Sequence, residues 1–176
     1  MRVLVTYGSS RGGTEGLAGA VADGLRECGL EVDVLPPKRV RDISGYDAVV
    51  VGGALYLFRW HRAARWFVRR HAAALRQRPT YFFSSGPLDD SAASTDIPPA
   101  AGVRSLMEQT GARSHVTFGG RLLPDARGIP ASAMAKNLSG DWRDPARARN
   151  WARQIARELT GEPAATAPAS RDEARS

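Results

Sequence analysis

The 176-residue chain has only one cysteine, and its composition excludes several classes of protein. A single thiol closes no intrachain disulfide and builds no cysteine metal site, and no metal is expected. The chain has no run of about eighteen apolar residues and no charged, cleavable leader, because it opens directly into a strand pattern. We therefore expect a cytoplasmic protein without a membrane span. Cys28, near the end of a predicted helix, is expected to be a half-buried structural thiol.

Acidic residues are missing from Ala48 to Leu88, and this stretch accounts for the whole net charge of +7. Its arginines are Arg59, Arg62, Arg65, Arg69, Arg70, Arg76 and Arg78. Such a stretch is either a solvated helix face or a basic surface for an acidic substrate or an anionic membrane. Nucleic acid is not expected as a partner, because no recognised binding motif accompanies the charge.

Strand and helix patterns alternate along the chain. Apolar runs predict strands at Val3–Tyr7, Glu31–Leu35, Ala48–Val51, Thr80–Phe83 and His115–Phe118. Helical spacing predicts helices at Thr14–Glu27, Arg59–Leu75, Ala101–Thr110 and Pro145–Leu159, and Leu122–Gly140 reads as largely irregular. This rhythm implies one α/β domain with a parallel sheet between helices, in which ligands bind beyond the carboxyl ends of the strands.

The first strand runs into a loop of glycines and hydroxyl residues, Gly8–Gly13, just before a helix. Backbone N–H groups and the positive end of the helix dipole make such a loop a phosphate site. The loop lacks the Gly-Lys-Ser/Thr of a Walker motif and the glycine spacing of a dinucleotide fingerprint. It also lacks a phosphatase cysteine, and Thr6 and Tyr7 stand where a response regulator needs acids. With these four kinds of site excluded, the loop still predicts a site for some other ligand that carries a phosphate.

The segment Thr6-Tyr7-Gly8-Ser9-Ser10-Arg11-Gly12-Gly13-Thr14-Glu15 resembles the phosphate loop of the flavodoxin family. The resemblance implies a flavodoxin-like, doubly wound five-stranded parallel sheet with helices on both faces. It further implies an FMN-binding domain over residues 1–161, and residues 162–176 are expected to be a disordered tail. The phosphate would be held by Ser9, Ser10, Arg11, Gly12, Gly13 and Thr14.

Two further loops are expected beside the first, at Gly53–Trp60 and Ser84–Asp90. Gly52–Tyr56 is similar to the flavodoxin loop beside the isoalloxazine ring, which places Ala54, Leu55 and Tyr56 at the ring. Three aromatic residues are candidates for stacking on it, with ordinary packing as the alternative for each: Tyr56, Phe58 and Trp60. The third loop would contribute Ser84, Ser85, Gly86, Pro87 and Asp89. It has no aromatic residue, which leaves one face of the ring open to a substrate.

Within this superfamily the chain looks most like the flavodoxin-like protoporphyrinogen dehydrogenase group. The likeness rests on Gly53–Ala63, on Phe67–His71 and on Trp142 with the last helix. It implies an FMN-dependent oxidoreductase that oxidises a protoporphyrinogen-like or other acidic substrate and passes electrons to a quinone. His61 is the candidate proton carrier, and no other catalytic residue is assigned.

Three other functions stay open: an electron-transfer flavodoxin without its own substrate, a basic interaction module that has lost FMN, and a tailoring enzyme of specialised metabolism. Positive charge near a flavin favours electron uptake over an acidic electron shuttle. The Arg59–Arg78 stretch also predicts peripheral contact with the anionic inner face of a membrane. The oligomeric state is left open.

Overall fold

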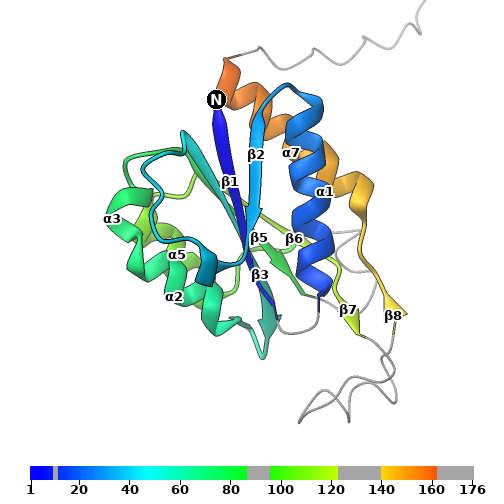
Figure 1. Ribbon diagram of the computed structural model, residues 1–176. Helices are drawn as coiled ribbons and strands as arrows, with labels where there is room; N and C mark the ends of the chain where they lie inside the picture. The colour runs from blue at the N-terminus through cyan, green and yellow to red at the C-terminus, as the bar shows by residue number, and fades with distance from the viewer. Residues whose placement is uncertain (10–11, 87–95, 123–139, 162–176) are drawn as a thin grey trace, which may run out of the picture.

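The computed structural model of the protein describes residues 1–9, 12–86, 96–122 and 140–161 (Figure 1). Strands and helices alternate over most of this length, as the sequence pattern predicts. In chain order the elements are β1 (Arg2–Gly8), α1 (Gly13–Glu27), β2 (Glu31–Leu35), the 3-10 turn η1 (Pro37–Arg39), β3 (Ala48–Tyr56), β4 (Arg59–Trp60), α2 (Arg62–Arg70), α3 (Ala72–Leu75), β5 (Thr80–Ser85), α5 (Ala101–Thr110), β6 (Ser114–Phe118), β7 (Arg121–Leu122), β8 (Gly140–Asp141) and α7 (Pro145–Thr160).

Five parallel strands form the sheet in the order β2-β1-β3-β5-β6, and β4 adds to β3 as an antiparallel strand. From β1 the chain moves to β2 at one edge of the sheet. From β3 it moves in the opposite direction, through β5 to β6 at the other edge, which confirms the doubly wound arrangement. The connections that follow β1 and β3 therefore diverge at the carboxyl edge of the sheet, which is where ligands bind in sheets of this type. A separate antiparallel pair joins β7 to β8.

Helices cover both faces of the sheet and enclose two apolar cores. Helices α1 and α7 pack on one face, while α2, α3 and α5 cover the other (Figure 1). Strand β3 serves both: Val50 joins the core under α1 and α7, and Val49 and Val51 join the one under α2. A strand buried on both faces explains its unbroken apolar run.

The stretch that the sequence predicts as one helix, Arg59–Leu75, is three elements. Residues Arg59 and Trp60 form β4, and helical geometry is interrupted at His71, which ends α2 and begins α3. Helical spacing of apolar side chains runs through all three, which is why the sequence pattern did not separate them.

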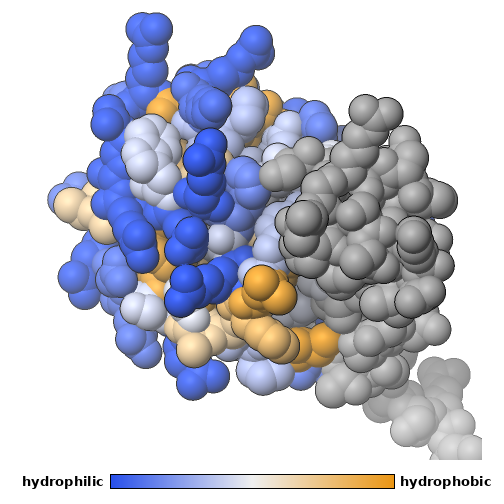
Figure 2. All heavy atoms as spheres, turned by 90° about the horizontal axis from the view of Figure 1, so that it is seen from below, coloured by the Kyte–Doolittle hydropathy of each residue, from blue (hydrophilic) through white to orange (hydrophobic). Residues whose placement is uncertain are grey.

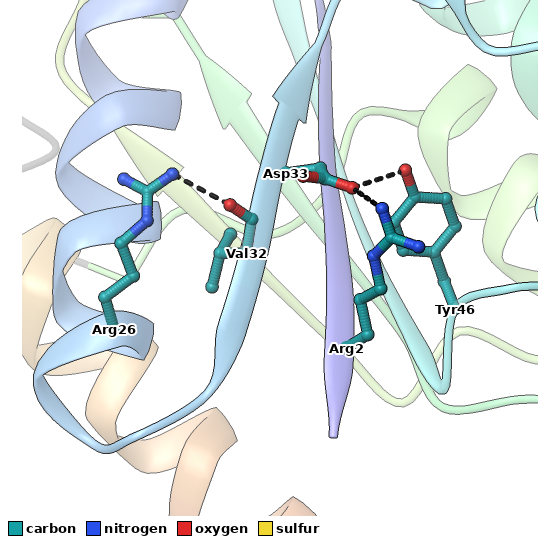
Figure 3. Close-up of polar contacts among 5 residues, drawn as sticks. All are labelled: Arg2, Arg26, Val32, Asp33 and Tyr46. Atoms are coloured by element: carbon teal, nitrogen blue, oxygen red, sulfur yellow. Dashed lines mark hydrogen bonds and ion pairs between the residues drawn. The ribbon is translucent and has the colours of Figure 1, made fainter.

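A polar cluster ties the edge strand β2 to its neighbours at the amino end of the sheet (Figure 3). Asp33 accepts hydrogen bonds from Arg2 Nη2 at 2.7 Å and from the Tyr46 hydroxyl at 2.8 Å. Arg26 of α1 donates to the Val32 carbonyl oxygen at 2.8 Å. The Tyr46 bond and the charge of Arg2 lower the pKa of Asp33. These contacts are structural and lie opposite the carboxyl edge.

The sequence also led to predictions about Cys28, about membrane spans and about the C-terminal tail. Cys28 is exposed, so the half-buried role predicted for it is wrong: it follows the last turn of α1 at the surface. Among the described residues, no helix is both long and apolar enough to cross a membrane. The predicted tail, residues 162–176, lies outside the described residues.

Candidate functional site

The N-terminus of α1 follows the carboxyl end of β1, next to the strand pair β1 and β3. Its N-cap, Gly12, has φ of 72° and, as a glycine, makes no side-chain cap hydrogen bond. Glycine tolerates this left-handed geometry, and the N-cap residue itself supplies no side-chain acceptor to the first backbone N–H groups. The N-terminus of a helix in this state attracts an anion.

Thr14 is, among the described residues, a buried hydroxyl without a partner that lies in the first turn of α1, beside the predicted phosphate loop. Its residue is 1% exposed, and its hydroxyl oxygen has no hydrogen-bond partner within the described part of the chain. A buried hydroxyl without a partner is unfavourable unless a ligand completes it. Gly8, at the end of β1, packs against α2, because a Cβ there would lie 2.6 Å from the backbone nitrogen of Ala64. Only glycine lets α2 approach β1 so closely.

Of the other residues predicted to contact the phosphate, the structure describes some and not others. Gly13 is buried at the start of α1, and Ser9 is partly exposed at the end of β1. Ser10 and Arg11 lie outside the described residues. Glu15 is tied to β1 by the Tyr7 hydroxyl at 2.8 Å, and burial with this bond raises the pKa of Tyr7 to about 12. Tyr7 is thus a hydrogen-bond donor at neutral pH.

The predicted loop Gly53–Trp60 is a β-hairpin. Strand β3 continues through Ala54 and Leu55 to Tyr56, and β4 returns at once, with Tyr56 paired to Arg59. The two turn residues, Leu57 and Phe58, have φ of 48° and 61°. A two-residue hairpin of this kind needs positive φ at both positions, which usually selects Asn-Gly. Leu-Phe carries no such signal, so the sequence did not reveal the turn.

Trp60 anchors this hairpin to the sheet. Its ring is 2% exposed and lies over Gly53, where a Cβ would be 2.4 Å from the ring. The indole Nε1 donates to Ser84 Oγ at 2.8 Å, and Ser84 Oγ lies 2.8 Å from His115 Nε2. Burial lowers the pKa of His115 to about 4, so the imidazole is neutral at neutral pH.

This network changes the list of residues available to a flavin. Trp60 is committed to the core, which leaves Tyr56 and Phe58 as the aromatic candidates at the edge. The Ser84 hydroxyl is likewise occupied inside the sheet, and Ser85 is buried, while Gly86 donates its backbone N–H to Phe118 at 3.0 Å. Pro87 and Asp89 lie outside the described residues. Sequence reasoning missed His115, which reads only as a polar residue in a strand.

His61 is the N-cap of α2, at the same edge. Its Nδ1 accepts from the Ala63 backbone N–H at 3.3 Å, and its ring meets that of Tyr56 edge-on with centroids 6.3 Å apart. Burial, together with Arg62 and Arg65, lowers the pKa of His61. The neutral imidazole therefore carries its proton on Nε2, as the Nδ1 bond assigns it.

The arginines of the acid-free stretch do not act as a single surface. Arg59, Arg62, Arg69 and Arg70 are exposed on β4 and α2. Arg78 is structural: its guanidinium donates to the carbonyl oxygens of Ala74 at 2.8 Å, of Tyr46 at 3.0 Å and of Ile43. Within this stretch, the exposed Arg59 in β4 and Arg62 at the start of α2 lie beside the hairpin, where an acidic ligand at the carboxyl edge could meet them.

We also searched the rest of the described chain for metal sites and cavities. No group of histidine, cysteine and acidic side chains suited to a metal ion occurs among the described residues. A hollow of about 330 Å³ lies between α1 and α7 and is lined by Gly16, Arg143 and Arg149 among others. No sequence pattern pointed to it.

Comparison with known proteins gives matches along most of the chain. A family model described as a flavodoxin domain matches residues 4–127. The protoporphyrinogen IX dehydrogenase [quinone] of Escherichia coli strain K12 is 31% identical over 86 residues, which is 48% of this chain and 48% of that protein. An NAD(P)H dehydrogenase (quinone) of Afipia carboxidovorans is 34% identical over 73 residues, 29% of this chain and 37% of that protein.

The chain aligns with about half or less of the length of these curated relatives. Among solved structures, a flavodoxin from the domain Archaea superposes with a TM-score of 0.62 at 15% identity, covering 91% of this chain and 99% of that one. At this identity the superposition shows the fold alone. The flavodoxin-like fold typically binds a flavin, and the two curated relatives are oxidoreductases.

Proposed function

Because the chain belongs to the flavodoxin family, we propose that it binds FMN at the carboxyl edge of its sheet and acts as an FMN-dependent oxidoreductase. The observation that carries the proposal is the uncapped N-terminus of α1 with the buried, unpartnered Thr14 hydroxyl beside it. A phosphate monoester there would accept hydrogen bonds from the backbone N–H groups of α1 and from the Thr14 hydroxyl. This donor set fits the phosphate end of FMN.

The other residues of the edge would hold the ring end of the cofactor. Ala54, Leu55 and Tyr56 would line it from β3, and Tyr56 or Phe58 would stack on it. Ser9, Ser10, Arg11, Gly12 and Gly13 would complete the phosphate loop, with backbone groups of Ser84, Ser85 and Gly86 and residues Pro87 and Asp89 on the third side. FMN supplies the two-electron acceptor chemistry when bound.

We further propose an acidic, reduced substrate such as a protoporphyrinogen-like tetrapyrrole, with a quinone as electron acceptor. The exposed Arg59 and Arg62 support this, since they lie at the edge in a stretch without acidic residues. The relatives' names, which include protoporphyrinogen IX and quinone, support the same pair. His61 would hold or release a proton at Nε2. The proposed location is the cytoplasm, with peripheral contact at the inner face of a membrane.

The test combines spectroscopy with turnover. The purified protein should take up FMN stoichiometrically and show a bound-flavin absorption band, and it should reduce a quinone when given protoporphyrinogen. An electron-transfer flavodoxin would bind FMN but turn over neither compound, and its two one-electron potentials would be widely separated. A protein that takes up no FMN in titration would instead be the basic interaction module, and the proposal would be wrong.

A further inference from the structure

The hollow of about 330 Å³ lies between α1 and α7, which run side by side on one face of the sheet (Figure 1). Its volume is at the low end of the range of small-molecule sites, about 300–1,000 Å³. Figure 2 shows an apolar area at the carboxyl edge, where the proposed function puts the flavin ring. None of the residues predicted to hold FMN lines the hollow, so it needs a separate explanation.

Small residues of α1 form the floor of the hollow. Gly16, Gly19 and Ala20 lie on neighbouring turns, and a Cβ on Gly19 would meet nothing within 4 Å. Glycine inside a helix is less stable than alanine, so folding gains nothing from glycine at position 19. The two helices are in close contact at Gly24, where a Cβ would lie 2.7 Å from the Arg149 carbonyl oxygen. The floor is therefore left open at a position where alanine would fit.

Arg143, which precedes α7, holds one nitrogen over this floor. Its Nε and Nη2 donate to the two carboxylate oxygens of Asp141 at 2.7 and 2.5 Å, and its side chain is 19% exposed. This bidentate pair fixes the plane of the guanidinium. The third nitrogen, Nη1, faces Gly16, where a Cβ would lie 2.5 Å from it. The Nη1 N–H donors are thus held in place at the hollow.

Arg149 of α7 supplies a positive charge that the described residues do not balance. It is half-buried in the wall, and over the described residues its guanidinium has no hydrogen-bond or ion-pair partner. Asp23, which also lines the hollow, is paired with Arg26 of its own helix at 3.3 Å. Asp141 is paired with Arg143. The hollow therefore has one unpaired positive charge, which favours an anion as its ligand.

We propose that the hollow binds the carboxylate of a small organic acid that has a flat apolar body. One carboxylate oxygen accepts from Arg143 Nη1 and the other from the Arg149 guanidinium, which makes two charge-assisted hydrogen bonds. A single unpaired charge matches a monoanion better than a phosphate dianion. The flat body lies on the small residues of the floor and against Pro145. This site goes beyond the proposed function and does not depend on it.

The experiment titrates the flavin-loaded protein with benzoate, a flat monocarboxylate, and follows the backbone amide signals by NMR. Benzoate should shift the signals of Gly16 and Gly19 saturably. Benzamide has the same shape without the charge and should bind at least about tenfold more weakly. Inorganic phosphate should also bind more weakly than benzoate. The flavin-free protein should bind benzoate with the same dissociation constant, because the site shares no residue with the predicted FMN site.

Three variants locate the site, with the Gly16 signal as the readout. Arg149→Gln should weaken benzoate binding at least about tenfold, because it removes the unpaired charge. Gly19→Ala should weaken binding at least about threefold by filling the floor, while it raises the unfolding temperature. Lost folding therefore cannot explain that loss of binding. Arg157→Gln removes the same charge from the last turn of α7 and should change binding less than about twofold.

The proposal is overturned if benzoate leaves the Gly16 and Gly19 signals unchanged, or if benzamide or phosphate binds as tightly as benzoate. It is also overturned if Gly19→Ala binds as the wild type does, or if Arg157→Gln loses as much affinity as Arg149→Gln. Binding to the flavin-free protein alone would assign the hollow to the flavin instead. Failure to take up FMN, read from the absorption spectrum, would defeat only the proposed function, because benzoate titration of the same protein would still decide this site.

Discussion

Thr14 offers the most direct test of the phosphate site, because its hydroxyl is buried without a partner. Thr14→Val keeps the shape and removes the oxygen. It should weaken FMN binding about tenfold to a hundredfold, the value of a hydrogen bond to a charged group. The unfolding free energy of the flavin-free protein should stay level or rise, since an unsatisfied hydroxyl is removed.

The control is Thr6→Val, the same chemical change at a second buried hydroxyl that has no partner in the described part of the chain; Thr6 lies in β1 rather than in the helix turn. It should leave the FMN dissociation constant unchanged. Equal loss of affinity in both variants, measured by fluorescence titration, would speak against a phosphate contact at Thr14.

His115 makes stability depend on pH through its burial. Its pKa is lowered to about 4 in the folded protein, against an ordinary value of 6.5. Above pH 6.5 His115 is neutral in both the folded and the unfolded chain, and the unfolding free energy has its full value. As the pH falls from 6.5 toward 4, the unfolding free energy decreases, because the unfolded chain binds the proton first. The lost unfolding free energy is of the order of 3 kcal/mol.

Urea unfolding at several pH values between about 4 and 7 tests this. His115→Gln keeps a polar partner for Ser84 and should flatten the pH dependence relative to the wild type. His61 and His71, whose pKa values are also lowered, contribute with the same sign in both proteins. Identical pH slopes in the two proteins would remove His115 from the account.

The β3–β4 hairpin depends on the contact between Gly53 and the Trp60 ring. A Cβ on residue 53 would meet the ring at 2.4 Å, so Gly53→Ala should displace Trp60 and lower the unfolding free energy by about 1–3 kcal/mol. Trp60 would also lose its bond to Ser84, which intrinsic fluorescence can report. The hairpin and the aromatic residues it carries should then lose their fixed position.

Gly19→Ala in α1 provides the matched control, because a Cβ there meets nothing within 4 Å. It should raise the unfolding free energy by about 0.5–1 kcal/mol, the ordinary gain from alanine inside a helix. If both substitutions have the same sign, glycine content rather than the Trp60 contact controls stability.

The elements were predictable where one local signal dominates. The apolar run Ala48–Val51 indicated a strand buried on both faces, and Gly111 and Gly161 end α5 and α7 with φ of 66° and 73°. The hairpin was not predictable, because Leu57–Phe58 lacks turn residues. Its conformation depends on the bond from Trp60 to Ser84, 24 positions away in sequence, which no local pattern reports.

The candidate site shows the same division. Gly12 and Thr14 were chosen from the loop pattern, and the structure puts an uncapped helix terminus and an unpartnered hydroxyl there, although FMN contact itself stays a prediction. Trp60 looked equivalent to Tyr56 and Phe58 in sequence. Trp60 differs from Tyr56 and Phe58 because it packs against Gly53 and is buried. Which of the three aromatic residues is buried depends on tertiary packing, and the local sequence does not show it.

The charges of the molecule predict how it would meet the proposed acidic substrate. The net charge of +7 and the exposed Arg59 and Arg62 should attract an anionic tetrapyrrole, so kcat/KM should fall as ionic strength rises. Arg59→Gln/Arg62→Gln should lower kcat/KM at low salt and reduce its salt slope.

The kinetic constants for an uncharged quinone should respond little to either change, which makes the quinone an internal control. Steady-state kinetics over about 0.01–0.5 M salt measures all of them. Equal salt slopes for wild type and variant would show that these two arginines do not steer the substrate.

Cys28 has a practical consequence for measuring electron flow. It is the one thiol in the chain, it is exposed, and it follows α1, which starts at the carboxyl edge and runs back 15 residues. A helix of that length spans about 22 Å, so a tether on Cys28 attaches at the opposite end of α1 from the carboxyl edge. Immobilised through this sulfur, every copy would face its carboxyl edge outward, in one orientation and without any engineered residue.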